Sequence, residues 1–198
     1  MKTFVLEGKS REIAASSADQ KRSLSALRKN AQVPAVLYGG EKVIHFSVSF
    51  DGIRPLVYTP EVFLVELTID GAKKMAIVKD LQFQPVTDEL LHVDFQEIFA
   101  DKPVMIEVPV VLSGYAEGVK AGGKLTLRMR KLKVKALYSN LPEKLVINVD
   151  KLGLGKSMQV GELTFDNLEL MNAKNAVVCA VQLTRAARGA AAAAAAGK

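Results

Sequence analysis

Apolar and polar residues alternate with a period of two along most of the chain, which is typical of strands that bury one face. In the first hundred residues we expect strands in "TFVLEGKSRE", "QVPAVLYGG", "KVIHFSVSF", "VFLVELTIDGAKKMAIVKDLQFQP" and "TDELLHVDFQEI". Asp70–Gly71 lies inside the fourth segment and is a strong signal for a tight hairpin turn. Pro55 and Pro60 are expected to break the segment "DGIRPLVYTPE".

One early segment, "SADQKRSLSALRKNA", has the spacing of a helix instead. Ser17 or Asp19 can cap its first turn, and Leu24, Leu27 and Ala31 fall on one side. We therefore predict a mainly β (α+β) protein in which a helix is inserted early among the strands.

A junction is expected at "FADKPV", residues 99–104. We predict a first domain over residues 1–99 and a second, β-rich domain over residues 100–184, with strands in "VMIEVPVVLSG", "KLVINVD" and "VGELTFDNLELMNAKNAVVCAVQL". Residues 185–198 are rich in alanine. A short helix without a packing partner is marginal, so we expect a frayed or disordered tail.

The segment "KLTLRMRKLKVK", residues 124–135, is strongly basic. Its alternation changes phase at Arg130–Lys131, which favours a strand with a bulge and a charged outer face. Such a face can protect a sheet edge or contact an anionic partner. We favour the solvated strand face over a primary RNA-binding role.

Charge is unevenly distributed along a chain with a net charge of +6. Residues 1–99 carry 12 basic and 13 acidic side chains, whereas residues 100–198 carry 15 and 8. An RNA-binding surface in the first half must therefore be a local patch. The single cysteine excludes an internal disulfide, and no apolar stretch is long enough for a transmembrane helix. We expect a cytoplasmic protein.

Two motifs suggest chemistry that their surroundings do not favour. "GLGKS", residues 153–157, resembles the end of a phosphate-binding loop, but the position that needs the first glycine holds Asp150. Cys179 lies in "AVVCAV", where a buried, inert thiol is expected rather than a nucleophile. Two histidines and one cysteine offer no metal-ligand cluster. We expect no catalytic group, no metal and no cofactor.

His92 and Asp94 are two residues apart on a predicted strand and should share one face. The pair is either a solvent-facing hydrogen-bonded pair or a group that reads RNA base edges and 2′-hydroxyls. A His–Asp pair could also orient a general base, but no Ser or Cys nucleophile lies beside it in the sequence, so catalysis is the least favoured interpretation. On the early helix, Lys21 and Arg28 are two turns apart and could contact successive phosphates. A solvated helix face would show the same spacing.

Two sets of segments together resemble a known family. "SALRKNAQVPAVLYGG" and "DLQFQPVTDELLHVDFQEI" resemble the bacterial large-subunit ribosomal proteins that bind 5S rRNA, number twenty-five in that series. "VPVVLSGYAEGVKAGGKL" and "NLPEKLVINVDKLGLGKSMQVGEL" resemble the longer, two-domain form known as the general stress protein Ctc type. The resemblance covers most of residues 1–184.

This resemblance implies an N-terminal β-barrel with inserted helices, which binds the loop E region of 5S rRNA, and a C-terminal β-rich domain. It also implies the RNA-binding positions of this sequence, which are Arg11, Lys21, Arg28, Tyr38, Lys79, Gln82, His92 and Asp94. We expect a non-enzymatic protein that is a monomer within the ribosome, next to other large-subunit components and away from membranes. The alternative is a stress-related protein–protein adaptor in which Leu24 and Ser25 weaken RNA binding.

Overall fold

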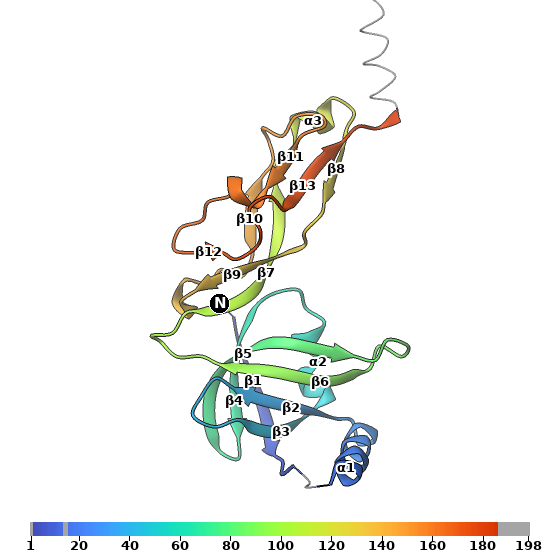
Figure 1. Ribbon diagram of the computed structural model, residues 1–198, viewed down its shortest axis with the longest axis vertical. Helices are drawn as coiled ribbons and strands as arrows, with labels where there is room; N and C mark the ends of the chain where they lie inside the picture. Colours follow the sequence, from blue (N-terminus) through green and yellow to red (C-terminus); the bar gives the residue numbers. More distant parts are fainter. Residues whose placement is uncertain (1, 14–15, 186–198) are drawn as a thin grey trace, which may run out of the picture. The chain divides into compact units, whose positions relative to one another are not determined.

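The computed structural model describes residues 2–13 and 16–185. The chain forms two compact units, residues 1–104 with 137–139, and residues 105–136 with 140 onward. The first contains a closed β-barrel and the second is also β-rich (Figure 1), which confirms the predicted fold class. The division at residues 99 and 100 stays a prediction, and the predicted tail after Arg185 lies outside the described residues.

Six strands form the barrel in the order β1-β3-β2-β6-β5-β4. They are β1 (Lys2–Ser10), β2 (Gln32–Tyr38), β3 (Ile44–Ser49), β4 (Phe63–Ile69), β5 (Ala72–Phe83) and β6 (Leu90–Glu97). Helix α1 (Ser17–Lys29) follows β1, and helix α2 (Phe50–Val57) follows β3. Parallel pairing of β1 with β4 and of β2 with β6 combines with antiparallel pairing elsewhere to close the barrel.

The barrel core contains alternate residues along most of the strand length. Phe46 and Phe95 are fully buried, with ring centroids 5.7 Å apart. Val93 is also fully buried, whereas its neighbours His92 and Asp94 are partly exposed. Burial of apolar surface is the main stabilising contribution in such a core. The same alternation places the polar residues between these positions on the outside.

The predicted hairpin turn is confirmed. Asp70 and Gly71 have φ angles of 48° and 86°, and they join the antiparallel strands β4 and β5. Two consecutive positive φ angles are characteristic of the type I′ turn that matches the natural twist of a hairpin.

Helix α2 is a correction to the sequence analysis, which expected Pro55 to break this segment. Pro55 lies inside the helix, and Ile53 and Leu56 are buried in the barrel core. A proline removes one intrahelical hydrogen bond. In this short helix, burial of two apolar side chains outweighs that loss.

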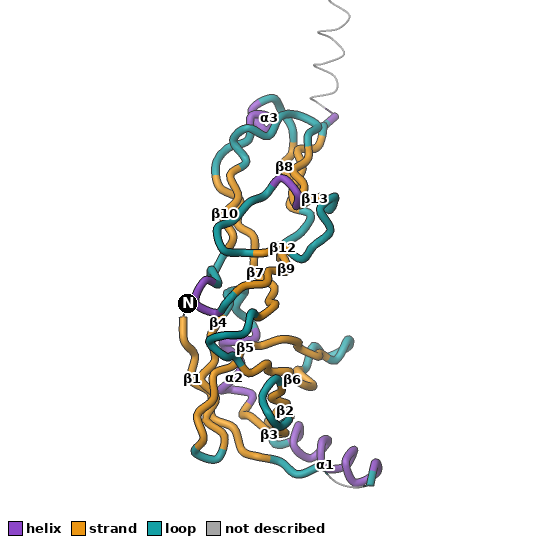
Figure 2. Tube along the Cα trace, turned by 60° about the vertical axis from the view of Figure 1, so that its left-hand side comes forward, coloured by secondary structure: helices purple, strands orange, loops and turns teal. Residues whose placement is uncertain are grey.

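Helix α1 is confirmed, but its predicted cap is not. The residue at the N-cap is Ser16, and its side chain makes no capping hydrogen bond. Ala31 lies beyond the helix with a φ of 53° and is exposed, so it does not extend the apolar side. Leu24 and Leu27 are half-buried where α1 packs beside β2 (Figure 2).

The second unit contains two further sheets. The first has the order β10-β7-β9-β12 and the second β11-β13-β8. Their strands are β7 (Val104–Ser113), β8 (Lys124–Leu127), β9 (Lys131–Ala136), β10 (Leu145–Asn148), β11 (Ser157–Gln159), β12 (Glu169–Leu170) and β13 (Val177–Gln182). Short helices occur at α3 (Glu117–Lys120) and Val160–Glu162, and a third, Tyr138–Asn140, begins in residues of the first unit and ends in the second.

The basic run 124–135 is not one bulged strand. It divides into β8 and β9, which belong to different sheets. The change of alternation at Arg130–Lys131 marks the passage of the chain between these sheets. The backbone N–H groups of Arg128 and Met129 both donate to the carbonyl of Val178 at this passage.

The "GLGKS" segment has a packing role. A Cβ atom on Gly118 would lie 2.6 Å from the carbonyl carbon of Gly153 and 2.7 Å from the backbone nitrogen of Leu154. The N–H of Gly118 also donates to the carbonyl of Leu152. Strand β11 follows this segment, whereas a phosphate-binding loop would lead into a helix.

Replacing Gly118 with alanine should destabilise the protein by roughly 1–3 kcal/mol, because the backbone around Gly153 must move. Gly153→Ala is the matched control, since its Cβ would meet only the Lys156 side chain at 3.7 Å. Urea unfolding of both variants measures the difference. Equal midpoints for the two variants would contradict this account of the close packing.

Cys179 is fully buried, as expected. Burial raises the pKa of its thiol, with a further contribution from the charge of Glu162. The folded state therefore disfavours the thiolate. The contribution of Cys179 to the free energy of unfolding is fully present below the pKa of the thiol in the unfolded chain. It is lost as the pH rises through the pKa of the thiol in the folded protein.

We expect Cys179 to react slowly with a thiol reagent near pH 8 in the native protein and quickly in denaturant, because the thiolate is the reactive form. Spectrophotometric labelling with and without urea measures this. Equal rates in both conditions would show that the thiol is accessible in the folded state.

Candidate nucleic-acid interface

A continuous row of residues crosses the outer surface of the barrel. The backbone N–H of Arg11 donates to the carbonyl of His45 at 2.8 Å, which places the end of β1 beside β3. Val36 on β2 is opposite His45, and Asp94 on β6 is opposite Val36. Asp80 on β5 is opposite Asp94. Because neighbouring strands are about 4.8 Å apart, the row extends roughly 20 Å.

Other predicted site residues lie next to this row. Gln82 is opposite His92, and Tyr38 is opposite Gln96. We call the outer surface made by Arg11, His45, Val36, Tyr38, Asp80, Gln82, His92 and Asp94 the outer polar face. Five of the eight residues expected to bind RNA, Arg11, Tyr38, Gln82, His92 and Asp94, are brought together there.

His92 and Asp94 share one face, as predicted. Nδ1 of His92 lies 2.7 Å from Oδ1 of Asp94, and 24% and 28% of the two side chains are exposed. The two atoms do not have the geometry of a hydrogen bond. This distance allows an ion pair whenever the imidazole is protonated. Both side chains remain accessible enough to contact a large ligand.

Tyr38 lies within electrostatic range of both acids. Partial burial raises the pKa of its hydroxyl, and the negative charges of Asp94 and Asp80 raise it further. The hydroxyl therefore stays protonated near neutral pH and can donate a hydrogen bond.

Arg11 adds a hydrogen-bond donor at the other end of the row. Its side chain is half-buried, and its Nε atom is buried without a hydrogen-bond partner among the described residues. An unsatisfied buried donor is costly. A guanidinium group can bind a phosphate through its remaining nitrogen atoms.

Helix α1 is attached to the barrel through Arg28. Its Nε and Nη2 atoms donate to the carbonyl oxygen of Leu91 at 3.3 and 3.1 Å. Leu91 directly precedes His92, so Arg28 links α1 to the strand that carries the His–Asp pair. Lys21 is exposed two turns earlier on nearly the same side of the helix.

Lys79 is the extra residue of a bulge in β5. Val78 is opposite Phe95 and Asp80 is opposite Asp94, although Phe95 and Asp94 are consecutive on β6. Bulges redirect side chains. Val78 and Leu81 both pack against the core, so both Lys79 and Asp80 lie outside.

Sequence reasoning missed His45 and Asp80. For His45 there was a signal, because the alternation in "KVIHFSVSF" places it on the polar side with Ser47 and Ser49. Asp80 gave no such signal, since an undetected bulge shifts the phase of the strand at this point.

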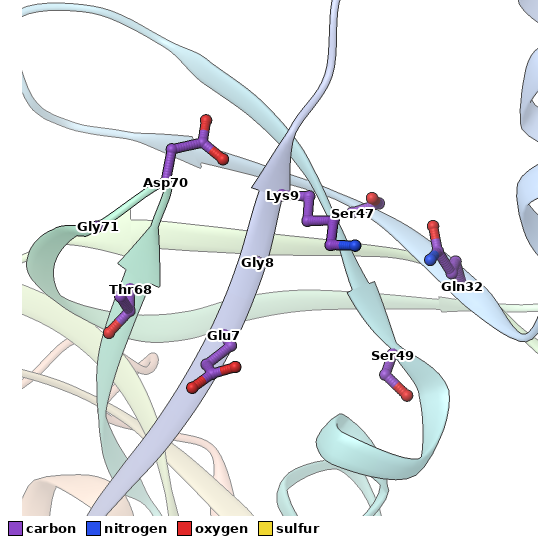
Figure 3. Close-up of a pocket in the computed structure, with 9 residues that line it drawn as sticks. All are labelled: Glu7, Gly8, Lys9, Gln32, Ser47, Ser49, Thr68, Asp70 and Gly71. Carbon is purple, nitrogen blue, oxygen red and sulfur yellow. The ribbon is translucent and has the colours of Figure 1, made fainter.

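A pocket of about 490 Å³ also opens on the barrel surface (Figure 3). Residues of β1, β2, β3 and β4 and of the Asp70–Gly71 turn line it, including Lys9, Ser47 and Thr68. Glu7 and Asp70 add carboxylates, so the pocket does not favour an anion. A hydrogen bond with the Ser10 side chain, and a second one from the Ser10 backbone N–H, lower the pKa of the Asp70 carboxyl group.

The basic strand β9 has acidic neighbours. Lys133 lies 4.0 Å from Glu107, and Lys135 lies 3.5 Å from Glu169. Such exposed ion pairs contribute little stability. They do reduce the positive field of the strand, which agrees with its interpretation as a charged outer face.

The structure gives two negative findings. In the part of the chain that it describes, no helix is long and apolar enough to cross a bilayer. Within those same residues, no group of three or more His, Cys, Asp or Glu side chains is placed to hold a metal ion.

Comparison with known proteins gives matches over both units. Residues 6–95 match the model of the ribosomal L25p family, and residues 103–185 match the C-terminal domain of ribosomal protein TL5. The chain is 75% identical over 190 residues to the large ribosomal subunit protein bL25 of Parabacteroides distasonis, covering 96% of this chain and 98% of the relative.

Two further relatives carry the same name. The protein from Bacteroides fragilis is 62% identical over 194 residues, with 98% of this chain and 99% of the relative covered. The protein from Porphyromonas gingivalis is 61% identical over 193 residues, with 96% and 98% covered.

Proposed function

The chain belongs to the ribosomal L25p family, and on that premise we propose that it is a structural, non-enzymatic component of the large ribosomal subunit in the cytoplasm. We further propose that the outer polar face of its barrel binds the loop E region of 5S rRNA. The observation that supports this most directly is the continuous row from Arg11 to Asp80, which offers cationic and hydrogen-bonding groups on one outward surface.

In this proposal, the position of the protein on the RNA depends on contacts with phosphate groups. Arg11 at one end of the row and Lys21 on α1 supply positive charge, and Lys79 adds a third cation near Asp80. Phosphate contacts fix orientation but carry no sequence information. Because residues 1–99 have no net positive charge, these local groups must provide the attraction.

Selectivity depends on groups that contact base edges and sugars. Double-stranded RNA presents 2′-hydroxyls and base edges in a shallow minor groove. His92, Gln82 and the Tyr38 hydroxyl can donate hydrogen bonds, whereas Asp94 can only accept them when ionised. Their common outward orientation allows simultaneous contacts with one groove.

Arg28 acts mainly through α1 in this proposal. Two of its nitrogen atoms are engaged by the carbonyl of Leu91, so it sets the position of the helix and hence of Lys21. It can still contribute its charge to the surface. The adaptor alternative receives no support from the comparisons, whose relatives are named as ribosomal proteins.

The direct test measures binding of the full chain to 5S rRNA by calorimetry, with tRNA as a competitor. We expect His92→Ala to weaken binding by roughly 1–3 kcal/mol, the usual magnitude for a base-edge contact, without changing the salt dependence. Tyr58→Phe is a control, because Tyr58 is an exposed residue at the end of α2 and outside the outer polar face. Unchanged affinity for His92→Ala would contradict the proposed face.

Helix α1 provides a second prediction that separates charge from position. Lys21→Ala should reduce the slope of log affinity against log salt by about one unit, because one phosphate contact is lost. Arg28→Lys keeps the charge but loses the planar fork of donors. It should weaken binding at an unchanged salt slope and increase hydrogen exchange in α1.

The control for Arg28→Lys is Arg54→Lys, an exposed substitution on α2. If Arg28→Lys bound RNA as tightly as the parent protein, with unchanged exchange in α1, the positioning role of Arg28 would be wrong.

A further inference from the structure

The bulge at Lys79 creates an unusual pair of side chains on the outer polar face. Asp80 and Asp94 are directly opposite each other on β5 and β6. Like charges in directly opposed positions destabilise a sheet. The backbone N–H of Leu81 donates to Oδ1 of Asp80 at 2.9 Å, which holds the carboxylate in place.

Two adjacent carboxylates are an unexpected feature of an RNA-binding face. The surface of an RNA helix is dominated by hydrogen-bond acceptors, namely phosphate oxygens and the minor-groove atoms of every base pair. An ionised carboxylate only accepts hydrogen bonds, so it is repelled wherever the RNA presents acceptors. It is tolerated only opposite a donor.

Donors in the minor groove are few. The 2′-hydroxyls occur on every nucleotide, and among the bases only guanine adds a donor, its N2 amino group. A carboxylate that faces the base edges, and not the sugars, can therefore distinguish guanine from the other bases. Two carboxylates side by side suit an amino group or an adjacent pair of donors.

We propose that Asp80, placed beside Asp94 by the Lys79 bulge, is a specificity-determining residue that selects guanine amino groups in the minor groove of the bound RNA. This inference rests on the proposed function and deepens it. Burial and the charges of Asp94 and Asp80 raise the pKa of the Tyr38 hydroxyl. This hydroxyl is available to donate a hydrogen bond to one carboxylate and orient it. Nδ1 of His92 lies 2.7 Å from Oδ1 of Asp94.

The test combines protein variants with RNA that lacks single amino groups. Inosine is guanosine without N2, so 5S rRNA is assembled with inosine at each loop E guanosine in turn, and affinities are measured for the full chain and for Asp80→Asn. At one or more positions, inosine should weaken binding by the parent protein roughly tenfold. Asp80→Asn should lose most of that discrimination, because a neutral amide oxygen accepts a hydrogen bond more weakly than a carboxylate does. The two changes then affect the same contact and are not additive.

A matched control is Asp88→Asn, an exposed acid at a turn with a φ of 54°. Asparagine tolerates that conformation, and the variant should keep the full sensitivity to inosine. Thermal unfolding of both variants establishes that they are folded. Repeating the titrations across magnesium concentrations separates direct reading of guanine from a cation shared by the two acids.

Each outcome is decisive. Loss of inosine discrimination in Asp80→Asn alone, at every magnesium concentration, supports the inference. Additive penalties for inosine and Asp80→Asn would overturn it, as would tighter binding of Asp80→Asn to all RNAs or an effect that follows magnesium. Failure of the parent protein to bind 5S rRNA would instead refute the proposed function, which is a separate result.

Discussion

Closure of the barrel is the constraint on which the functional surface depends. Strand β1 pairs with β3 on one side and with β4 on the other, so the six strands leave no free edge within the sheet. Gly8 permits this closure, since a Cβ atom there would lie 2.6 Å from the Phe46 ring. Once the sheet is closed, every strand has one face in the core and one face outside. The side chains of β2, β6 and β5 are then held in fixed rows, which a loop could not achieve with the same precision.

The charges that matter for RNA binding are those of the outer polar face itself, and not the net charge of the barrel. The barrel half of the chain is almost neutral, and the acids Asp80 and Asp94 lie among the groups proposed to contact RNA. A uniformly basic surface would bind many nucleic acids with little discrimination. A mixed surface binds more weakly to arbitrary RNA, because each carboxylate must meet a donor. The arrangement therefore favours recognition of one folded RNA over general affinity.

Period-two alternation was sufficient to predict the barrel strands, the Asp70–Gly71 turn and the shared face of His92 and Asp94, because each depends on local geometry. The family resemblance, not the pattern, supplied the RNA-binding roles.

Three features could not be predicted from the sequence, for physical reasons. Helix α2 exists because Ile53 and Leu56 reach the barrel core, a long-range effect that overrides Pro55. The bulge at Lys79 and the sheet change after Leu127 both depend on the pairing partner, which no single segment reveals. Asp80 and the link from Arg28 to Leu91 were missed for the same reason.

The division of the basic run between two sheets bears on how the second unit contributes. A single long cationic strand would present a line of charge suited to a phosphate backbone. Instead, β8 pairs with β13 while β9 pairs with β12, and Lys133 and Lys135 lie near Glu107 and Glu169. Exposed charges of opposite sign at such distances screen each other. The excess of positive charge in this half of the chain is thus distributed over several surfaces, which suits general attraction to an anionic environment better than recognition of one RNA site.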